Sequence, residues 1–417
     1  MLQTTTLKNK IRILTDSDAN AESVSLGVWV SVGARFETED VNGISHMLEH
    51  MAFKGTTSRS AFQISKEIED VGGFINAYTG KNMTAYYVRV LKEHQKKGLD
   101  IIADILQNSV MDKTELAKEK GVIIQEINMQ NDTPDDLVFD YFNEVAYPNQ
   151  PLGRAILGTV DSVKRISSEQ LLDYMHNEYT TPRIIISASG AVDHEEFVAL
   201  CNEKFNSFKE DDRPNAPKAF YKGGEKRVSK PNEQVNLVLG FEGVPYSHQD
   251  YYTYKILSGI LGGGMSSRLF QEIREERGLV YSIYAFSSSE TDTGIFGVYA
   301  GTSEKEVKEL MPVLCDELVK LPHTLTEEEI LRAKARLKSS LLMRYENIST
   351  HAEMNAIDTI LYGRVVPKEE IIAKIEDVSA QNLERVAKEL LSRTPTLAAL
   401  GPISEVMPME MILERLK

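Results

Sequence analysis

Two stretches of the sequence decide how this chain folds. Residues 24–32 read VSLGVWVSV, and residues 46–50 read HMLEH. The first stretch alternates in a way that predicts a β-strand. The second lies in a helical pattern whose apolar residues fall opposite the histidines and the glutamate: Ile44, Met47, Leu48 and Met51. Asp40 or Asn42 can cap the start of this helix, and Gly55 can close its end.

The polar side of this helix has the composition of half a catalytic zinc site. His46 and His50 are four residues apart and therefore lie one above the other, and Glu49 shares their face. Neutral imidazoles are zinc ligands, and a neighbouring carboxylate can take a proton from metal-bound water. H-x-x-E-H is the inverted form of a known zinc-protease motif. The alternative is a surface helix with two chance histidines, but the whole chain has only eight.

Length and composition limit the class of protein. A chain of 417 residues suggests two or three domains, and 42% hydrophobic with 26% charged residues is typical of globular proteins. The net charge of −15 argues against nucleic acid and is compatible with basic peptides or with no charged partner. Cys201 and Cys315 are the only cysteines, so we expect neither a disulfide framework nor cysteine ligands for zinc.

The sequence predicts a cytoplasmic protein without a membrane span. No apolar run approaches the roughly 20 residues that cross a bilayer. The first residues, MLQTTTLK, form neither a secretory signal nor an Arg- and Ser-rich transit peptide. We therefore expect a cytoplasmic location, or a mature protein that has already been trimmed.

The chain divides into two similar halves around a linker. Residues 209–227 are rich in charge, Pro and Gly and predict that linker, between an N-terminal zinc-binding domain at 1–208 and a C-terminal domain at 228–417. The strand-like run 235–240 and the helical stretch 251–261 repeat the order strand, then helix. Aligning Val24 with Val235 places residues without ligand atoms opposite the motif: Leu257, Ile260 and Leu261. This pattern predicts a duplication whose second copy lacks the metal motif, although two unrelated domains could match by chance.

Each half is expected to be α+β. Within the first half, residues 61–71 are helical, 74–79 and 84–90 are strand-like, and long helical patterns follow near 93–108 and 113–130. We expect two structurally similar domains, each with a mixed, mainly antiparallel sheet and helices packed on one face.

A catalytic zinc normally has three protein ligands, so the motif needs one more. Glu119 and Glu126 are seven residues apart and share one face of the 113–130 helix, and Glu126 lies among isoleucines. An exposed glutamate on a charged helix is the alternative, and spacing alone does not choose between them.

At this point the sequence resembles a known family. HMLEHMAFKGT followed by EKGVIIQEINMQNDTPDD resembles the pitrilysin and mitochondrial processing peptidase family of zinc metallopeptidases, most closely its short bacterial members and the processing peptidase β subunit. In that family the third ligand is a Glu 76 residues after the second His, which is the position of Glu126 here. Glu119 matches a second acidic residue that supports the zinc site from outside the ligand set.

The resemblance extends to residues that contact substrate. Asn76 and Ala77, in GFINAYT, match an edge strand that pairs with extended substrate backbone, although a simple structural edge strand remains an alternative. Arg274 and Tyr281 are seven residues apart, as in a family pair that holds substrate and stabilises the oxyanion. By composition alone they lie in an ordinary charged helix that runs into a strand.

The resemblance implies a zinc endopeptidase with one Zn²⁺ per chain and Glu49 as general base, acting on unfolded peptides or presequence-like segments inside a chamber. Family members build that chamber from four such domains, so a two-domain chain is expected to form a homodimer, or a heterodimer with a related chain. Arg274 and Tyr281 would then come from the partner. A non-catalytic assembly or partner subunit is the main alternative, and a hydrolase of another bond is a third.

Overall fold

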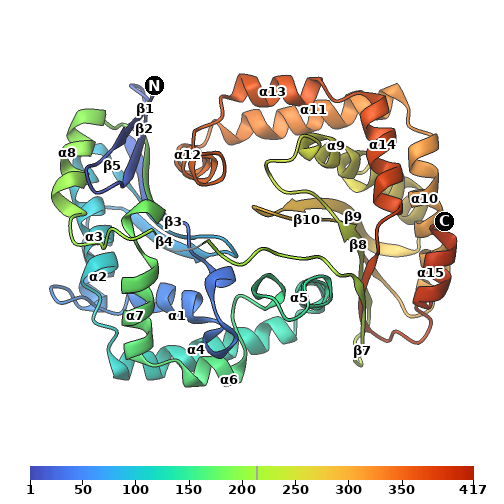
Figure 1. Ribbon diagram of the computed structural model, residues 1–417, viewed down its shortest axis with the longest axis horizontal. Helices are drawn as coiled ribbons and strands as arrows, with labels where there is room; N and C mark the ends of the chain where they lie inside the picture. Colours follow the sequence, from blue (N-terminus) through green and yellow to red (C-terminus); the bar gives the residue numbers. More distant parts are fainter. Residues whose placement is uncertain (213–214) are drawn as a thin grey trace. The chain divides into compact units, whose positions relative to one another are not determined.

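The computed structural model describes residues 1–212 and 215–417 and divides them into two compact units (Figure 1). The first unit contains Met1–Asn128, Ala155–Pro217 and Met343–Val366. The second unit contains Met129–Arg154, Lys218–Leu342 and Pro367–Lys417. Each unit therefore takes one segment from the opposite half of the sequence.

The first unit is built on a six-stranded sheet with the order β1-β2-β6-β3-β5-β4. Neighbouring strands are antiparallel except β2 and β6, which are parallel. The strands are β1 (Leu2–Thr6), β2 (Arg12–Ser17), β3 (Ser23–Val30), β4 (Phe74–Thr79), β5 (Thr84–Leu91) and β6 (Ile184–Gly190).

The second unit repeats this topology with five strands in the order β7-β11-β8-β10-β9. Only β7 and β11 are parallel, as β2 and β6 are in the first unit. The strands are β7 (Gly224–Ser229), β8 (Val235–Glu242), β9 (Val280–Ser289), β10 (Gly294–Thr302) and β11 (Thr396–Gly401). β3 and β8 occupy equivalent places, as the aligned runs at 24–32 and 235–240 predict. The α+β class with two similar mixed sheets is confirmed.

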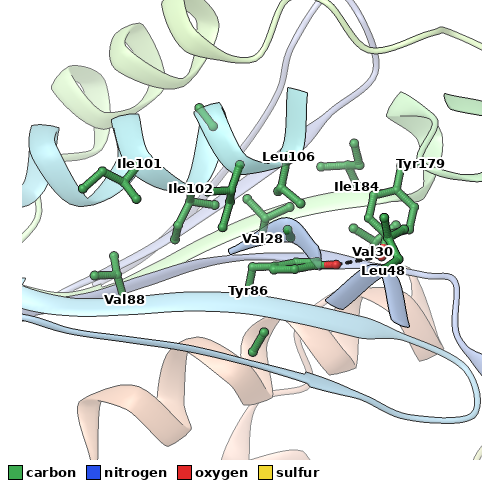
Figure 2. Close-up of a cluster of buried hydrophobic side chains, with 14 of the residues drawn as sticks. Val28, Val30, Leu48, Tyr86, Val88, Ile101, Ile102, Leu106, Tyr179 and Ile184 are labelled. Atoms are coloured by element: carbon green, nitrogen blue, oxygen red, sulfur yellow. Dashed lines mark hydrogen bonds between the residues drawn. The ribbon is translucent and has the colours of Figure 1, made fainter. Parts of the chain in front are cut away.

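One face of the first sheet carries the main core of its unit. Side chains of β3 alternate toward this face and pack with β5 and α3 (Gln95–Gln107), as Figure 2 shows for Val28, Val88 and Ile102. The hydroxyl groups of Tyr86 and Tyr179 meet inside this core at 3.1 Å. Complete burial of such apolar side chains contributes roughly 1.5–3 kcal/mol each. The remaining helices of the first unit's N-terminal part are α1 (Ile44–Ala52), α2 (Ala61–Glu69), α4 (Lys113–Asn131), α6 (Val160–Arg165), α7 (Ser168–Glu178) and α8 (His194–Lys204).

The opposite face of the first sheet is also covered, which differs from the expected packing on one face only. α12 (Ile348–Tyr362) places Ala352 and Ala356 against Trp29 and Ile185. The reason is that β3 and β6 carry apolar side chains on both faces, so each face needs a cover.

The second sheet is covered in the same way. α5 (Pro134–Ala146) places Phe139 on Phe286 of β9, whereas α9 (Tyr251–Gly262) approaches the adjacent Ala285 and so lies on the other face. The other helices of this unit are α10 (Val307–Lys320), α11 (Glu327–Arg344), α13 (Lys368–Glu376), α14 (Ala380–Leu391) and α15 (Met409–Arg415). No helix within residues 1–212 and 215–417 is long and apolar enough to cross a membrane.

The predicted domain ranges relate to these units only loosely. Part of the expected linker at 209–227 forms strand β7, and α5 and α12 each join the sheet of the other half. Ranges 1–208 and 228–417 therefore remain a proposal for the two copies of a duplication. The compact units differ from these ranges, because α5 belongs to the second unit and α12 to the first.

An ion network around the buried Asp104 holds the loop that follows α1. Arg59 reaches Asp104 at 2.7 Å and Asp100 at 2.6 Å, and the loop hydroxyl groups also donate to Asp104. Burial alone would raise the pKa of Asp104, but hydrogen bonds from Thr56 and Arg59 lower it below the ordinary 3.8. The charged carboxylate is therefore part of the folded structure.

Asp104→Asn is expected to lower the free energy of unfolding by about 2 kcal/mol, because Arg59 keeps Asp100 but loses one buried charged partner. Since the folded pKa is lowered, the stabilisation from Asp104 is present above about pH 4 and is lost as the pH falls below it. Urea unfolding of both proteins at pH 7 and pH 3 measures this. A stability difference that is equally large at both pH values would contradict it.

Candidate active site

The zinc-motif helix α1 forms because one of its sides is apolar. Ile44, Met47, Leu48 and Met51 are all buried, and they join the core of the first unit. The predicted caps are wrong: α1 begins after Gly43, which has a φ of 95° and no side-chain cap, and it ends before Phe53. Packing places His46, Glu49 and His50 on the side away from the core residues.

Glu126 of α4 meets both histidines of α1. Glu126 Oε2 lies 3.8 Å from His46 Nε2 and 3.8 Å from His50 Nε2. Ligand atoms of these three residues all lie within 4.8 Å of one another, and they form the one such group among the residues that the structure describes. Of the carboxylates that the sequence left open as third ligand, Glu126 is the one in this position.

The donor set fits a zinc ion. Tetrahedral zinc with bonds of about 2.0–2.2 Å would hold neighbouring ligand atoms roughly 3.3–3.6 Å apart, close to the distances found here. Glu126 Oε2 is buried and has no hydrogen-bond partner, which is unfavourable unless a cation faces it. Burial, and then the neighbouring His50, lower the pKa of His46 to about 4, so its imidazole is neutral at pH 7. Neutral imidazole is the form that binds metals.

Glu119 orients His50, one of the candidate ligands. Its Oε2 lies 3.0 Å from His50 Nδ1, and its Oε1 lies 2.7 Å from Lys54 Nζ. If the proton of His50 is on Nδ1, the lone pair of Nε2, on the side of Glu126, is available to a metal. Burial would raise the pKa of Glu119, but hydrogen bonds from Lys54 and His50 lower it. Lys54 was not predicted, although it follows His50 by four residues in the same motif.

Glu49 is held by a residue that sequence reasoning also missed. Thr79, at the end of β4, donates a hydrogen bond of 2.5 Å from its hydroxyl group to Glu49 Oε2. Burial raises the pKa of Glu49, while the hydrogen bond from Thr79 and the charge of His50 oppose the increase. A carboxylate with a raised pKa, oriented by a hydroxyl group beside a metal centre, is suited to proton transfer.

The strand that carries Thr79 lies at the edge of its sheet. β4 pairs with β5 on one side and ends the strand order, so its outer backbone groups are open to an added strand. Asn76 is exposed on this strand, and Ala77 turns toward the core. The expected edge strand is therefore present, and its role in substrate binding stays a prediction.

Arg274 and Tyr281 belong to the second unit, whereas the metal-ligand group belongs to the first. Arg274 lies in the π-helical turn η6 (Phe270–Glu276), with its guanidinium group 4.7 Å from the centre of the Phe270 ring. Tyr281, near the start of β9, is 76% exposed. π-Helical turns often mark functional sites, and an exposed tyrosine is free to contact another molecule.

The site combines the imidazoles of His46 and His50 with the carboxylate of Glu126, and Glu49 lies on the same helix as the histidines. These are the residue types of a metallopeptidase centre. Residues 12–160 match the family model "Insulinase (Peptidase family M16)", and residues 165–337 match "Peptidase M16 inactive domain". The chain belongs to peptidase family M16, which confirms the family resemblance.

Individual relatives agree with this assignment. The chain is 40% identical to an "Uncharacterized zinc protease" of Rickettsia felis, over 95% of this chain and 96% of that protein. It is 33% identical to the human mitochondrial-processing peptidase subunit beta, over 96% of this chain and 85% of that protein. A crystal structure of a protease from Helicobacter pylori has the same fold, with a TM-score of 0.88 and 24% identity over 96% of this chain and 99% of that one. A metallopeptidase class and zinc as the metal follow from the family.

Glu119→Gln is expected to weaken zinc affinity about 10- to 100-fold, because His50 Nδ1 loses its charged acceptor. Competition with a chromophoric chelator measures the affinity. Glu115→Gln on the same helix is the matched control, since Glu115 also lies 2.7 Å from a lysine, Lys118, but is not paired with a histidine. Equal affinities for the two variants would contradict the role of Glu119.

Proposed function

We propose that this protein is a zinc-dependent endopeptidase that hydrolyses unfolded peptides or presequence-like segments. The observation that carries the proposal is the convergence of His46, His50 and Glu126, with Glu49 on the same helix. Zinc held by these three residues would polarise the scissile carbonyl and lower the pKa of water toward ~7. The family and its named zinc proteases support the same reading.

In this proposal, other residues of the chain transfer the proton and bind the substrate. Glu49, oriented by Thr79, accepts a proton from the attacking water and later delivers it to the leaving amine. β4 holds the substrate as an added strand, with Asn76 and Ala77 in contact with it. Because backbone pairing reads extended conformation more than side chains, such a site favours unfolded segments.

Glu49→Gln is expected to lower hydrolysis of a fluorogenic peptide by about 10²- to 10⁴-fold while one zinc per chain is retained, because Glu49 takes part in proton transfer and not in ligation. Peptide cleavage and metal content are measured on the same preparation. Glu69→Gln, an exposed glutamate at the end of α2, is the control and should match the wild type. A zinc-loaded wild type that cleaves no extended peptide would instead favour the non-catalytic partner subunit.

The proposal includes a dimer, either of two copies or with a related chain. One human relative is named as a β subunit, which supports a partner chain. In this arrangement Arg274 and Tyr281 of the partner's second unit hold the substrate and stabilise the oxyanion. A cytoplasmic location is also part of the proposal, and two free, buried cysteines are compatible with a reducing compartment.

Mixing Glu49→Gln with Tyr281→Phe tests whether Tyr281 acts on the partner's site. If it does, half of the randomly reassembled dimers contain one copy of each variant. Each mixed dimer has one complete site of two, so about a quarter of wild-type activity returns. Peptide cleavage after denaturation and joint refolding measures this. Activity no higher than the mean of the separate variants would contradict the action of Tyr281 on the site of a second copy. A fully active monomer by gel filtration would contradict the dimer.

A further inference from the structure

The start of α1 lacks an ordinary cap. The first four backbone N–H groups of a helix have no partner within it, and they are normally satisfied by an N-cap side chain. Here the N-cap position is Gly43, and the first turn of α1 contains no acidic residue. With nine residues, α1 is also too short to be stable without such external contacts.

Glu37 takes over this role from a position outside the helix. Its Oε1 accepts a hydrogen bond of 2.9 Å from the backbone N–H of Ser45, and its Oε2 accepts one of 2.8 Å from Gly43. Oε2 also accepts 2.9 Å from the side-chain amide of Asn42. Glu37 is 2% exposed, so a buried carboxyl group lies at the positive end of the α1 dipole. Burial raises the pKa of Glu37, while the hydrogen bonds from Gly43 and Asn42 oppose the increase.

The surrounding turn is fixed as well. The side-chain amide of Asn42 donates a second hydrogen bond, to the backbone carbonyl of Ala155. The backbone carbonyl of Asn42 accepts a hydrogen bond from the Ser162 hydroxyl group. Gly158 approaches so closely that a Cβ there would lie 2.4 Å from the Asn42 carbonyl oxygen. The Ser45 hydroxyl lies 2.9 Å from that of Tyr174 on α7. Glu37 therefore connects α1 to a turn that cannot shift on its own.

The bonded N–H of Ser45 directly precedes His46. If α1 began one residue earlier or later, its side chains would be rotated by about 100° about the helix axis. Both imidazoles would then turn away from Glu126. Glu37 holds the backbone N–H groups of Gly43 and Ser45, so it acts on the metal site through the backbone at the start of α1.

We propose that Glu37 is a positioning residue for the metal centre: its carboxylate sets the start and rotation of α1, so that His46 and His50 face Glu126. This inference rests on the proposed binding of zinc. Neither the ligands nor the general base is altered when Glu37 is changed, so metal affinity reports on helix placement.

Glu37→Gln tests this with Asp104→Asn as the matched control. Both replace a buried carboxyl group of the first unit that accepts several hydrogen bonds by an amide, but the partners of the Asp104 carboxylate lie outside α1. Gln cannot accept at both positions, so the backbone N–H of either Gly43 or Ser45 loses its partner. Zinc affinity by chelator competition, with thermal unfolding of the metal-free proteins alongside, is measured for both variants.

We expect Glu37→Gln to weaken zinc affinity at least about tenfold and Asp104→Asn to keep it within about twofold. Asn42→Ala, which keeps the carboxylate but removes one of its donors, should give a smaller loss and replaces Glu37→Gln if that variant does not fold. Equal losses in the Glu37 and Asp104 variants, or no loss in a folded Asn42→Ala, would overturn the inference while zinc binding by the wild type stands. A wild type that binds no zinc would overturn the proposed function and this inference with it.

Discussion

The placement of α1 is the constraint on which the rest of the candidate site depends. Its apolar side must pack into the core of the first unit, and its polar side must at the same time present two imidazoles to Glu126. A nine-residue helix cannot meet both demands through its own propensity. The sheet supplies the burial, and Glu37 and its surrounding turn supply the start of the helix.

The charged groups around this helix are arranged in pairs. Glu119 stands between His50 and Lys54, and Glu49 accepts a hydrogen bond from Thr79. Each of these buried or half-buried groups would be costly alone, because desolvation disfavours an unpaired charge. Glu126 Oε2 is different, since it is buried without a hydrogen-bond partner and faces the neutral imidazole of His46. A metal cation bound between Glu126 and the two histidines would supply the missing charge.

The two units share one strand arrangement, and among the described residues only the first carries a group of metal-ligand side chains. β3 and β8 occupy the same place in their sheets, and α1 and α9 follow them in sequence. Where α1 carries His46 and His50, the aligned positions of α9 carry Leu257 and Leu261, which are both buried. The second unit has the same fold and exposes Tyr281 on its edge strand β9. Its proposed role is to contact the substrate.

Local pattern was sufficient for the parts of this protein that are governed by short-range periodicity. The apolar and polar sides of α1, the strand equivalence of 24–32 and 235–240, and helices α2, α3 and α4 follow from the sequence, because burial on one face imposes a period. The third ligand was open from spacing alone and needed the family resemblance, since several carboxylates share the helix of Glu126.

Only the tertiary structure decided which groups cap, orient and cover these elements. Glu37 replaces the expected caps, Thr79 and Lys54 join the site, and α5 and α12 cross to the sheet of the opposite half. These contacts join residues that are distant in sequence or lie on different elements. Their partners are selected by the shape and charge of the folded surface, which no local period encodes.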